Sequence, residues 1–463
     1  MDFSSIEVWT FVIQIGIVLT ALLFSNFLRQ KSAKIRKALI PVAVIAGFLL
    51  LAVKYIFKGY GIEIIDETLY EKIVYHSIAL GFIAMSLRTT DDAQRDPGSL
   101  VGVRSGAIIV STYLVQGTIG LIISLLLAKT IKPDMFPGSG ILLAMGFGQG
   151  PGQANNVGTT FEAAGMQGGR SYGLAIAACG YIVACTIGVI VMNILRRKNK
   201  LSVREEKTVN DITVSYFQGD DELPVSDSID RLSIQIALVF VVYLLTYFLT
   251  VGLTGLLDSF GVGESLKSIL WGFNFILGSA VAIIVRICFK EGKEKNIIKK
   301  QYQNNYLLNR ISGFFFDIMI ICGIASIDIE DLTGYLLPFI LMTVIGTIGT
   351  WGWLSYVCKK AYPEYYYEGL MAMFGMLTGT IGSGVLLLRE IDPNYETPAA
   401  NNLVLGSSFG VVMAIPMLIL IGEAALGYSQ SVLTLILVIA YFFILAAVAL
   451  LPSLKKKKKI KDN

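Results

Sequence analysis

Long apolar segments, separated by short polar loops, follow one another along nearly the whole chain. A helix needs about 20 apolar residues to cross a bilayer, and most of these segments approach or exceed that length. They cover approximately residues 8–28, 38–57, 72–88, 101–128, 171–195, 232–256, 266–289, 311–327, 334–358, 398–422 and 431–451. The pattern therefore predicts an all-α polytopic membrane protein whose surrounding solvent is a lipid bilayer.

Two further stretches, 138–169 and 369–388, are rich in glycine and too interrupted to cross a bilayer as one continuous helix. In the first, the only sustained apolar run covers 141–147. Backbone N–H and C=O groups in such a stretch cannot face lipid, so the stretch must lie within protein or line a wet cavity. In transporters, interrupted segments of this kind hold the ligands.

Lysine and arginine residues mark the cytoplasmic loops of a membrane protein. A basic cluster at 29–37 follows the first apolar segment, which places that loop inside and the N-terminus outside. Further basic clusters follow 171–195 and occupy 455–459. Both are cytoplasmic only if 138–169 and 369–388 each enter and leave the membrane on one side. The charges therefore predict two re-entrant hairpins, a cytoplasmic C-terminus and location in the cell membrane.

With both hairpins re-entrant, the chain consists of four helices, a hairpin and a fifth helix, twice over. The first copy starts outside and the second inside, which makes two inverted-topology repeats of five transmembrane helices. The clearest local sequence similarity between the two halves is that of Leu143-Ala144-Met145 to Met371-Ala372-Met373. The expected divisions are an N-terminal repeat at 1–195, a cytoplasmic linker at 196–231, a C-terminal repeat at 232–430, and an extra transmembrane helix with a basic tail at 431–463.

Composition narrows the function classes. The chain of 463 residues is 54% hydrophobic and only 16% charged, which is typical of a membrane protein. It has one histidine, and its five cysteines lie in apolar segments without metal-ligand spacing. Neither an HExxH-type motif nor a selectivity-filter repeat occurs. We therefore expect no enzyme, no cofactor and no nucleic-acid partner, and an ion channel is a weaker alternative than a carrier.

The hairpins carry the candidate chemistry. At the tip of a re-entrant hairpin, the incoming half-helix presents free carbonyls, which suit a cation, and the outgoing one presents free N–H groups, which suit an anion. Gly150-Pro151-Gly152 is the expected first tip, because glycine accepts a positive φ and proline stops a helix. Oxygen ligands without a carboxylate cluster favour Na⁺ over Ca²⁺ or Zn²⁺.

The predicted site residues form two sets. The substrate-binding set is Gly152, Gln153, Asn155, Asn156, Gly382, Ser383, Gly384 and Arg389, and the sodium-binding set is Gly148, Gly150, Thr159, Thr378, Gly379, Thr380, Asp317, Asn401 and Asn402. Arg389 is either a clamp for a substrate carboxylate or a boundary charge. Asp317 either coordinates an ion or pairs with Arg310. Asn401 and Asn402 are expected to face the second hairpin.

Two motifs in the hairpins resemble the sodium/glutamate symporter family. They are MGFGQGPGQANNVGTTFEAAG at 145–165 and MLTGTIGSGVLLLREIDP at 376–393. The layout of two inverted halves, each with a Gly-rich loop, extends the resemblance over most of the chain. The resemblance implies a homodimeric secondary transporter that uses Na⁺, with the two loops meeting at the substrate site and an elevator-like movement of the part that bears them.

The chain departs from that family at both loops. Family members that transport glutamate tend to carry His-Gly-Thr-Gly where this chain has 149–152, and Gly-Ala-Thr-Pro-Thr where it has 379–383. The expected function is Na⁺-coupled symport of glutamate or a related small amino acid or carboxylate by alternating access. A Na⁺- or H⁺-coupled carrier of di- or hydroxycarboxylates is the alternative in the same class.

Overall fold

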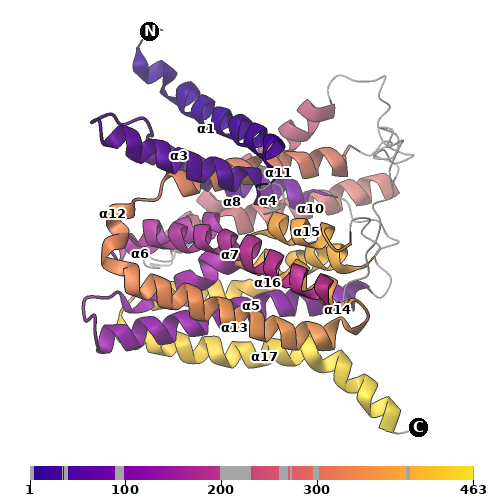
Figure 1. The fold of residues 1–463 in the computed structure, drawn as a ribbon. Helices are drawn as coiled ribbons and strands as arrows, with labels where there is room; N and C mark the ends of the chain where they lie inside the picture. Colours follow the sequence, from indigo (N-terminus) through magenta and orange to yellow (C-terminus); the bar gives the residue numbers. More distant parts are fainter. Residues whose placement is uncertain are drawn as a thin grey trace. The chain divides into compact units, whose positions relative to one another are not determined.

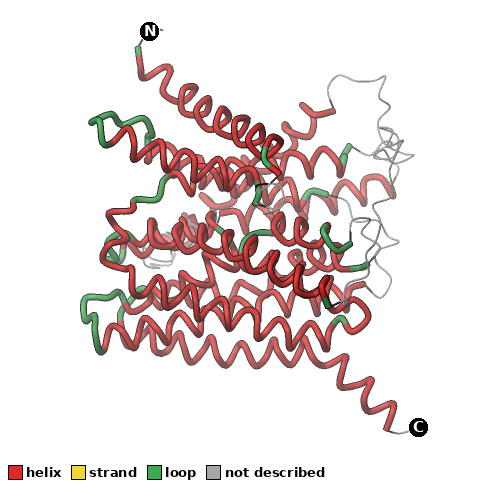
Figure 2. Tube along the Cα trace, in the orientation of Figure 1, coloured by secondary structure: helices red, strands yellow, loops and turns green. Residues whose placement is uncertain are grey.

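The structure is a computed structural model that describes residues 5–33, 35, 40–88, 98–198, 231–259, 270–271, 274–295, 302–392 and 397–461. Within these ranges every regular element is a helix and no strand occurs (Figure 2). The all-α prediction is therefore confirmed for the described part of the chain. The predicted linker at 196–231 lies almost entirely outside the described residues.

Each half of the chain has four long helices, a broken helical pair and a fifth long helix, in the order that the sequence predicts (Figure 1). The N-terminal half contains α1 (Ile6–Lys31), α3 (Val42–Lys58), α4 (Glu67–Ser86), α5 (Gly98–Lys129), η2 (Pro137–Ile141), η3 (Ala144–Gln149), α6 (Pro151–Ala163) and α7 (Gly169–Arg197). The C-terminal half contains α8 (Arg231–Ser259), α10 (Asn274–Glu294), α11 (Asn305–Ala325), α12 (Ile329–Leu332), η6 (Thr333–Tyr335), α13 (Leu336–Ala361), η7 (Pro363–Tyr365), α14 (Tyr366–Thr378), α15 (Ile381–Arg389), α16 (Ala399–Ala424) and the extra helix α17 (Tyr428–Lys461). The inverted orientation of the halves stays a prediction.

Eight of the eleven predicted spanning helices are long and apolar enough to cross a membrane, as judged from the described residues. They are α1, α5, α7, α8, α11, α13, α16 and α17. The other three fall short for physical reasons. α3 has 17 residues, or about 26 Å of helix, α4 begins with charged residues, and charged residues fill the last turns of α10. These helices make the chain a multi-pass membrane protein, while the plasma membrane and the sides of the termini stay predictions.

The chain divides into two compact units. The larger contains Met1–Glu71, Pro97–Glu206 and Ile320–Asn463, and the smaller contains Lys72–Asp96 and Lys207–Met319. Each unit draws on both sequence halves, so the units do not coincide with the predicted repeats, and the divisions fall inside α4 and α11. The smaller unit has its own apolar core, which includes residues of α4, α8, α10 and α11.

Helices α5 and α7 form the centre of the larger unit. α5 packs against α13, α16 and α17 (Figure 1), and α7 packs against both broken pairs. Glycines permit the closest approaches: a Cβ atom built on Gly120 would overlap the backbone of Gly140, and one built on Gly180 would overlap the carbonyl oxygen of Thr378. Small residues allow membrane helices to approach this closely. The packing fixes both broken pairs against the same helix, α7.

Candidate functional site

The first broken pair changes direction at Gly150. Its incoming arm is irregular, with a 3₁₀ turn in η2 and a π-helical turn in η3, and its outgoing arm is the regular helix α6. Gly150 has a φ of 86°, which glycine adopts without a steric penalty. Pro151 is the first residue of α6, where its missing N–H leaves no hydrogen bond unmade. The break therefore falls where the sequence predicts the tip.

The second broken pair consists of two regular helices, α14 and α15. Gly379 (φ −137°, ψ −104°) and Thr380 (φ −143°, ψ 174°) separate them with non-helical backbone. The two arms pack closely, because a Cβ atom built on Gly375 would lie only 2.9 Å from Cα of Gly384. Gly384, predicted as a substrate residue, thus has an evident packing role between the arms.

The two breaks lie next to each other in the larger unit. A Cβ atom built on Gly150 would lie 3.3 Å from Cγ2 of Thr380 and 3.4 Å from the carbonyl oxygen of Gly379. The side chain of Tyr181, on α7, borders both breaks, since its Oη would lie 3.9 Å from a Cβ atom built on Gly150 and its Cδ1 would lie 3.1 Å from a Cβ atom built on Gly379. The structure therefore brings the predicted residues Gly150, Gly379 and Thr380 together.

Both outgoing helices begin at the breaks without a side-chain cap. Gly150, at the N-cap of α6, has no side chain, and the Thr380 hydroxyl makes no capping hydrogen bond to α15. The first N–H groups of a helix have no partner within the helix, and the helix dipole adds a partial positive charge there. Two adjacent uncapped N-termini suit an anionic group such as a carboxylate.

Buried polar side chains without partners lie at the same two helix starts. Gln153 and Ser383 are each the third residue of their helix and are 1% and 2% exposed. Among the described residues, no hydrogen-bond partner reaches either amide atom of Gln153, Oδ1 of Asn155 or the Ser383 hydroxyl. Leaving such a group unsatisfied costs about 1–3 kcal/mol. Groups in this state are typical of a site that a bound ligand or water completes.

The remaining substrate residues that the sequence predicts near the breaks lie in the first two turns of these helices. Gly152 is buried in the first turn of α6, and Gly382 is exposed in the first turn of α15. Asn156 is buried in the second turn of α6 and already makes an interaction within the structure.

The incoming arms supply oxygen atoms. The last carbonyls of a helix have no N–H partner within it, so η3 and α14 both end with a partial negative charge at the breaks. Thr378 is fully buried, and its hydroxyl donates to the Phe374 carbonyl at 2.7 Å. Gly148 lies against Tyr113 and Gln116 of α5. The sodium residues predicted at the two tips thus lie at oxygen-rich helix ends.

Gln116, Tyr113 and Tyr181 are residues of this region that the sequence does not single out as site residues. They lie in the middle of long apolar helices, where an isolated polar residue most often makes an interhelical hydrogen bond. Gln116 does so, since its Nε2 donates to Oγ1 of Thr350 at 3.0 Å. No local pattern shows that the same side chain also reaches the end of α14.

The structure does not place four of the predicted sodium-binding residues at the breaks. Thr159 is exposed in the third turn of α6. Asn402 donates through Nδ2 to the Tyr365 hydroxyl at 2.9 Å, before the first turn of α14 and thus at the end opposite the break. Asp317 belongs to the smaller unit, where the described residues show no ion pair with Arg310. The side chain of Asn401 lies outside the described ones, as does that of the substrate residue Arg389.

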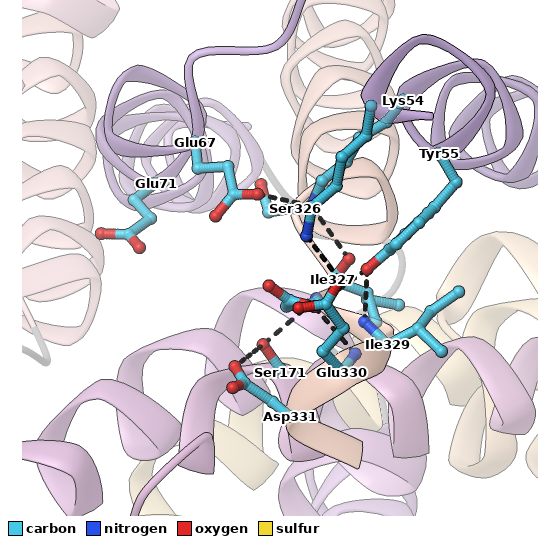
Figure 3. A network of polar contacts seen from close by, with 12 residues as sticks. Lys54, Tyr55, Glu67, Glu71, Ser171, Ser326, Ile327, Ile329, Glu330 and Asp331 are labelled. Carbon is cyan, nitrogen blue, oxygen red and sulfur yellow. Dashed lines mark hydrogen bonds and ion pairs between the residues drawn. The ribbon is translucent and has the colours of Figure 1, made fainter. Parts of the chain in front are cut away.

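A second polar region of the larger unit joins α3, α4, α7 and α12 (Figure 3). Lys54 lies 2.5 Å from Oε1 of Glu67 and donates to the Ile327 carbonyl at 3.1 Å. Arg170 pairs with Glu71 at 2.9 Å. Ser171 donates to Oδ2 of Asp331 at 3.0 Å. The charged groups of this region are paired with one another, which indicates that the region stabilises the packing of these helix ends.

Asp328 is the centre of the hydrogen bonds between α3 and α12. Its Oδ1 accepts from the Tyr55 hydroxyl at 2.9 Å and from the N–H of Glu330 at 2.8 Å. Partial burial raises the pKa of the Asp328 carboxyl, but these two hydrogen bonds and the charges of Lys54 and Lys58 hold it below its ordinary value. Within the described residues, no group of three or more His, Cys, Asp or Glu side chains is arranged to hold a metal ion.

Comparisons with known proteins do not identify a family. No protein-family model matches the chain, and no curated protein matches it either.

Proposed function

We propose that this protein is a secondary active transporter that moves a small carboxylate, such as glutamate or a related amino acid, together with Na⁺. The observation that supports this proposal best is the meeting of two broken helical pairs whose outgoing helices are uncapped and carry buried, unpartnered polar groups. Discontinuous helices at membrane depth are where many secondary transporters hold their substrate and coupling ion.

The two kinds of helix end complement the charges of the proposed cargo. The N-termini of α6 and α15 attract a carboxylate, and Gln153 supplies an amide donor beside the first of them. The C-terminal ends of η3 and α14 attract a cation. Oxygen atoms of carbonyl, hydroxyl and amide groups, without a carboxylate cluster, suit Na⁺. A single site of this kind binds anion and cation side by side, which ties the movement of one to the other.

Alternating access follows if this paired site opens to each side of the membrane in turn. A homodimer and an elevator-like movement belong to the same proposal. A carrier of di- or hydroxycarboxylates, coupled to Na⁺ or H⁺, would use the same helix ends without an ammonium group on its substrate, and the choice between these substrates rests on transport measurements.

Uptake into proteoliposomes tests the proposal. Purified protein is reconstituted, and radiolabelled L-glutamate is supplied with an inward Na⁺ gradient, an inward K⁺ gradient or no gradient. Accumulation that requires Na⁺ and disappears with the Na⁺ ionophore monensin supports symport. Competition by unlabelled dicarboxylates, hydroxycarboxylates and other amino acids then defines the substrate.

Each negative result has its own meaning. If glutamate is not taken up but another carboxylate is, the transporter proposal stands and glutamate is wrong. If none of these solutes is transported, and neither they nor Na⁺ shift the melting temperature of the purified protein, the transporter proposal is wrong.

A further inference from the structure

The side chain of Gln116 touches both broken helical pairs. It lies in the middle of α5 and is completely buried. Its Nε2 donates to the carbonyl oxygen of Leu377, the last residue but one of α14, at 2.7 Å. On the other side, a Cβ atom built on Gly148 would lie 2.7 Å from Oε1 of Gln116, so the amide oxygen faces the end of η3.

The orientation of this amide follows from its partners. A backbone carbonyl can only accept, so the group that faces Leu377 must be the NH₂ end. Its second N–H donates to the Thr350 hydroxyl. With both N–H groups used, the remaining polar atom is Oε1, which is an acceptor. Among the described residues, no donor reaches this buried oxygen.

The surroundings of Oε1 favour a cation. It lies beside the terminal residues of η3, whose last carbonyls have no N–H partner within the helix. The same amide contacts α14 at its C-terminal end, so two partial negative charges from helix ends converge on this place. A neutral amide oxygen is the kind of hard ligand that Na⁺ accepts, and the free carbonyls at the end of η3 are further ligands of the same kind on the neighbouring element.

We propose that Oε1 of Gln116 is a ligand of the coupling Na⁺ at the end of η3, and that its NH₂ group holds the end of α14 in register with that ion. This inference rests on the proposed function and adds a specific residue to it. One side chain would then bind the ion and position both broken helical pairs. Ion binding and the correct arrangement of the two breaks therefore depend on each other.

Na⁺ binding to purified protein without substrate tests this role. The readout is the half-saturating Na⁺ concentration, that is the dissociation constant, fitted from the rise of the melting temperature with Na⁺ concentration, with K⁺ replacing Na⁺ to hold ionic strength constant. Gln116→Met keeps the side-chain length and removes the oxygen and the donors. We expect it to raise the half-saturating Na⁺ concentration by about tenfold or more, the effect of roughly 1.4 kcal/mol.

Gln235 provides the matched control. It is also a buried glutamine, 1% exposed, but both ends of its amide are satisfied, by the Tyr302 carbonyl at 2.7 Å and the Asn304 N–H at 3.2 Å. Gln235→Met should lower the melting temperature without changing the half-saturating Na⁺ concentration. Gln116→Asn is the second variant for the site. It keeps the amide group but shortens the side chain by one methylene, which moves the amide oxygen away from the proposed ion. It should also weaken Na⁺ binding, and it takes the place of Gln116→Met if that variant does not fold.

The outcomes separate the inference from the proposed function. If wild-type protein responds to Na⁺ and both Gln116 variants respond at the same concentrations, Gln116 is only a structural residue and the inference is wrong. If wild-type protein shows no response to Na⁺ at all, Na⁺ coupling itself fails, and the inference falls with it.

Discussion

Gln153 and Ser383 occupy equivalent positions, as the third residues of the two helices that start at the adjacent breaks, and both have buried polar side-chain atoms without a described partner. An unsatisfied group is costly wherever it is buried. Two such groups at matching positions of two different helices are what a shared ligand site at the breaks would require. The matching positions are the strongest link between the fold and the proposed transport.

Removing these polar groups should harm transport and spare stability. We expect Gln153→Leu and Ser383→Ala to raise the KM for the transported solute by about tenfold or more, because each loses a contact worth roughly 1–2 kcal/mol. The melting temperature should stay unchanged or rise, since an unsatisfied group has been removed. Initial rates of uptake and thermal unfolding in detergent measure the two effects.

Ser105→Ala is the control for this prediction. Ser105 is buried too, but its hydroxyl lies 2.8 Å from the Tyr362 hydroxyl and shares a hydrogen bond with it. The control should therefore show the opposite result, a lower melting temperature with an unchanged KM. A drop in melting temperature for Ser383→Ala as large as that of the control would contradict the assignment of Ser383 to a ligand site.

Gly150→Ala should abolish transport by two routes. Gly150 has φ 86° and ψ −174°, a backbone conformation that is essentially restricted to glycine and costs other residues about 1–3 kcal/mol, and the new methyl group would crowd Thr380 at 3.3 Å. Gly165 offers a matched comparison, since its φ is 103° but a Cβ atom there would meet nothing within 4 Å. Gly165→Ala should show a similar loss of stability and retain uptake; equal loss of uptake in both would mean that the conformational penalty alone accounts for the effect.

The pair of Lys54 and Glu67 should behave as one unit in unfolding experiments. Lys54→Met and Glu67→Gln are each expected to lower stability, and the double variant should lose less than the sum, with a coupling of about 1 kcal/mol. The estimate is modest because the Glu67 side chain is 36% exposed and water screens its charge. A double-mutant cycle on melting temperatures measures the coupling, and strict additivity would show that the 2.5 Å contact contributes nothing.

Acid should weaken the link between α3 and α12 at Asp328. The pKa of this carboxyl is lower in the folded protein than in the unfolded chain, so its stabilising contribution is complete above the unfolded value of about 3.9 and is lost as the pH falls through the folded value. At pH 7, Asp328→Asn should cost about 1 kcal/mol, given the partial exposure of the group. The gap between variant and wild type should narrow steadily as the pH falls below about 4, and a gap that stays constant on acidification would contradict the prediction.

The positions of the breaks could be predicted because they depend on local backbone chemistry. Proline between two glycines at 150–152 stops a helix, and two threonines around a glycine at 378–380 weaken one. Helix order could be predicted for a similar reason, since length and apolarity act within each segment. The three helices that fall short of a span are those whose ends contain charged residues or that are only 17 residues long.

Residues that act through distant partners could not be predicted in this way. Gln116 forms hydrogen bonds with Thr350 and Leu377, which are 234 and 261 positions away along the chain. Tertiary packing of this kind decides which side of α5 faces the breaks. The same cause explains the residues that lie elsewhere than expected. Thr159 is on the exposed face of α6, and the Asn402 amide is engaged by Tyr365. The position of Thr159 around its helix and the tertiary hydrogen bond of Asn402 explain why these residues lie elsewhere than predicted.

The unequal construction of the two incoming arms has a consequence for comparing the two halves of the sequence with each other. One arm is a 3₁₀ and π-helical segment that ends at a one-residue break, and the other is a regular α-helix that ends at a two-residue break. Met145 accordingly precedes its N-cap residue Gly150 by five positions, whereas Met373 precedes its N-cap residue Thr380 by seven. An alignment of the halves anchored on the similar tripeptides therefore misaligns the outgoing helices by two residues. Only an alignment with a gap in the incoming arm, anchored on the N-cap residues, compares positions that are structurally equivalent.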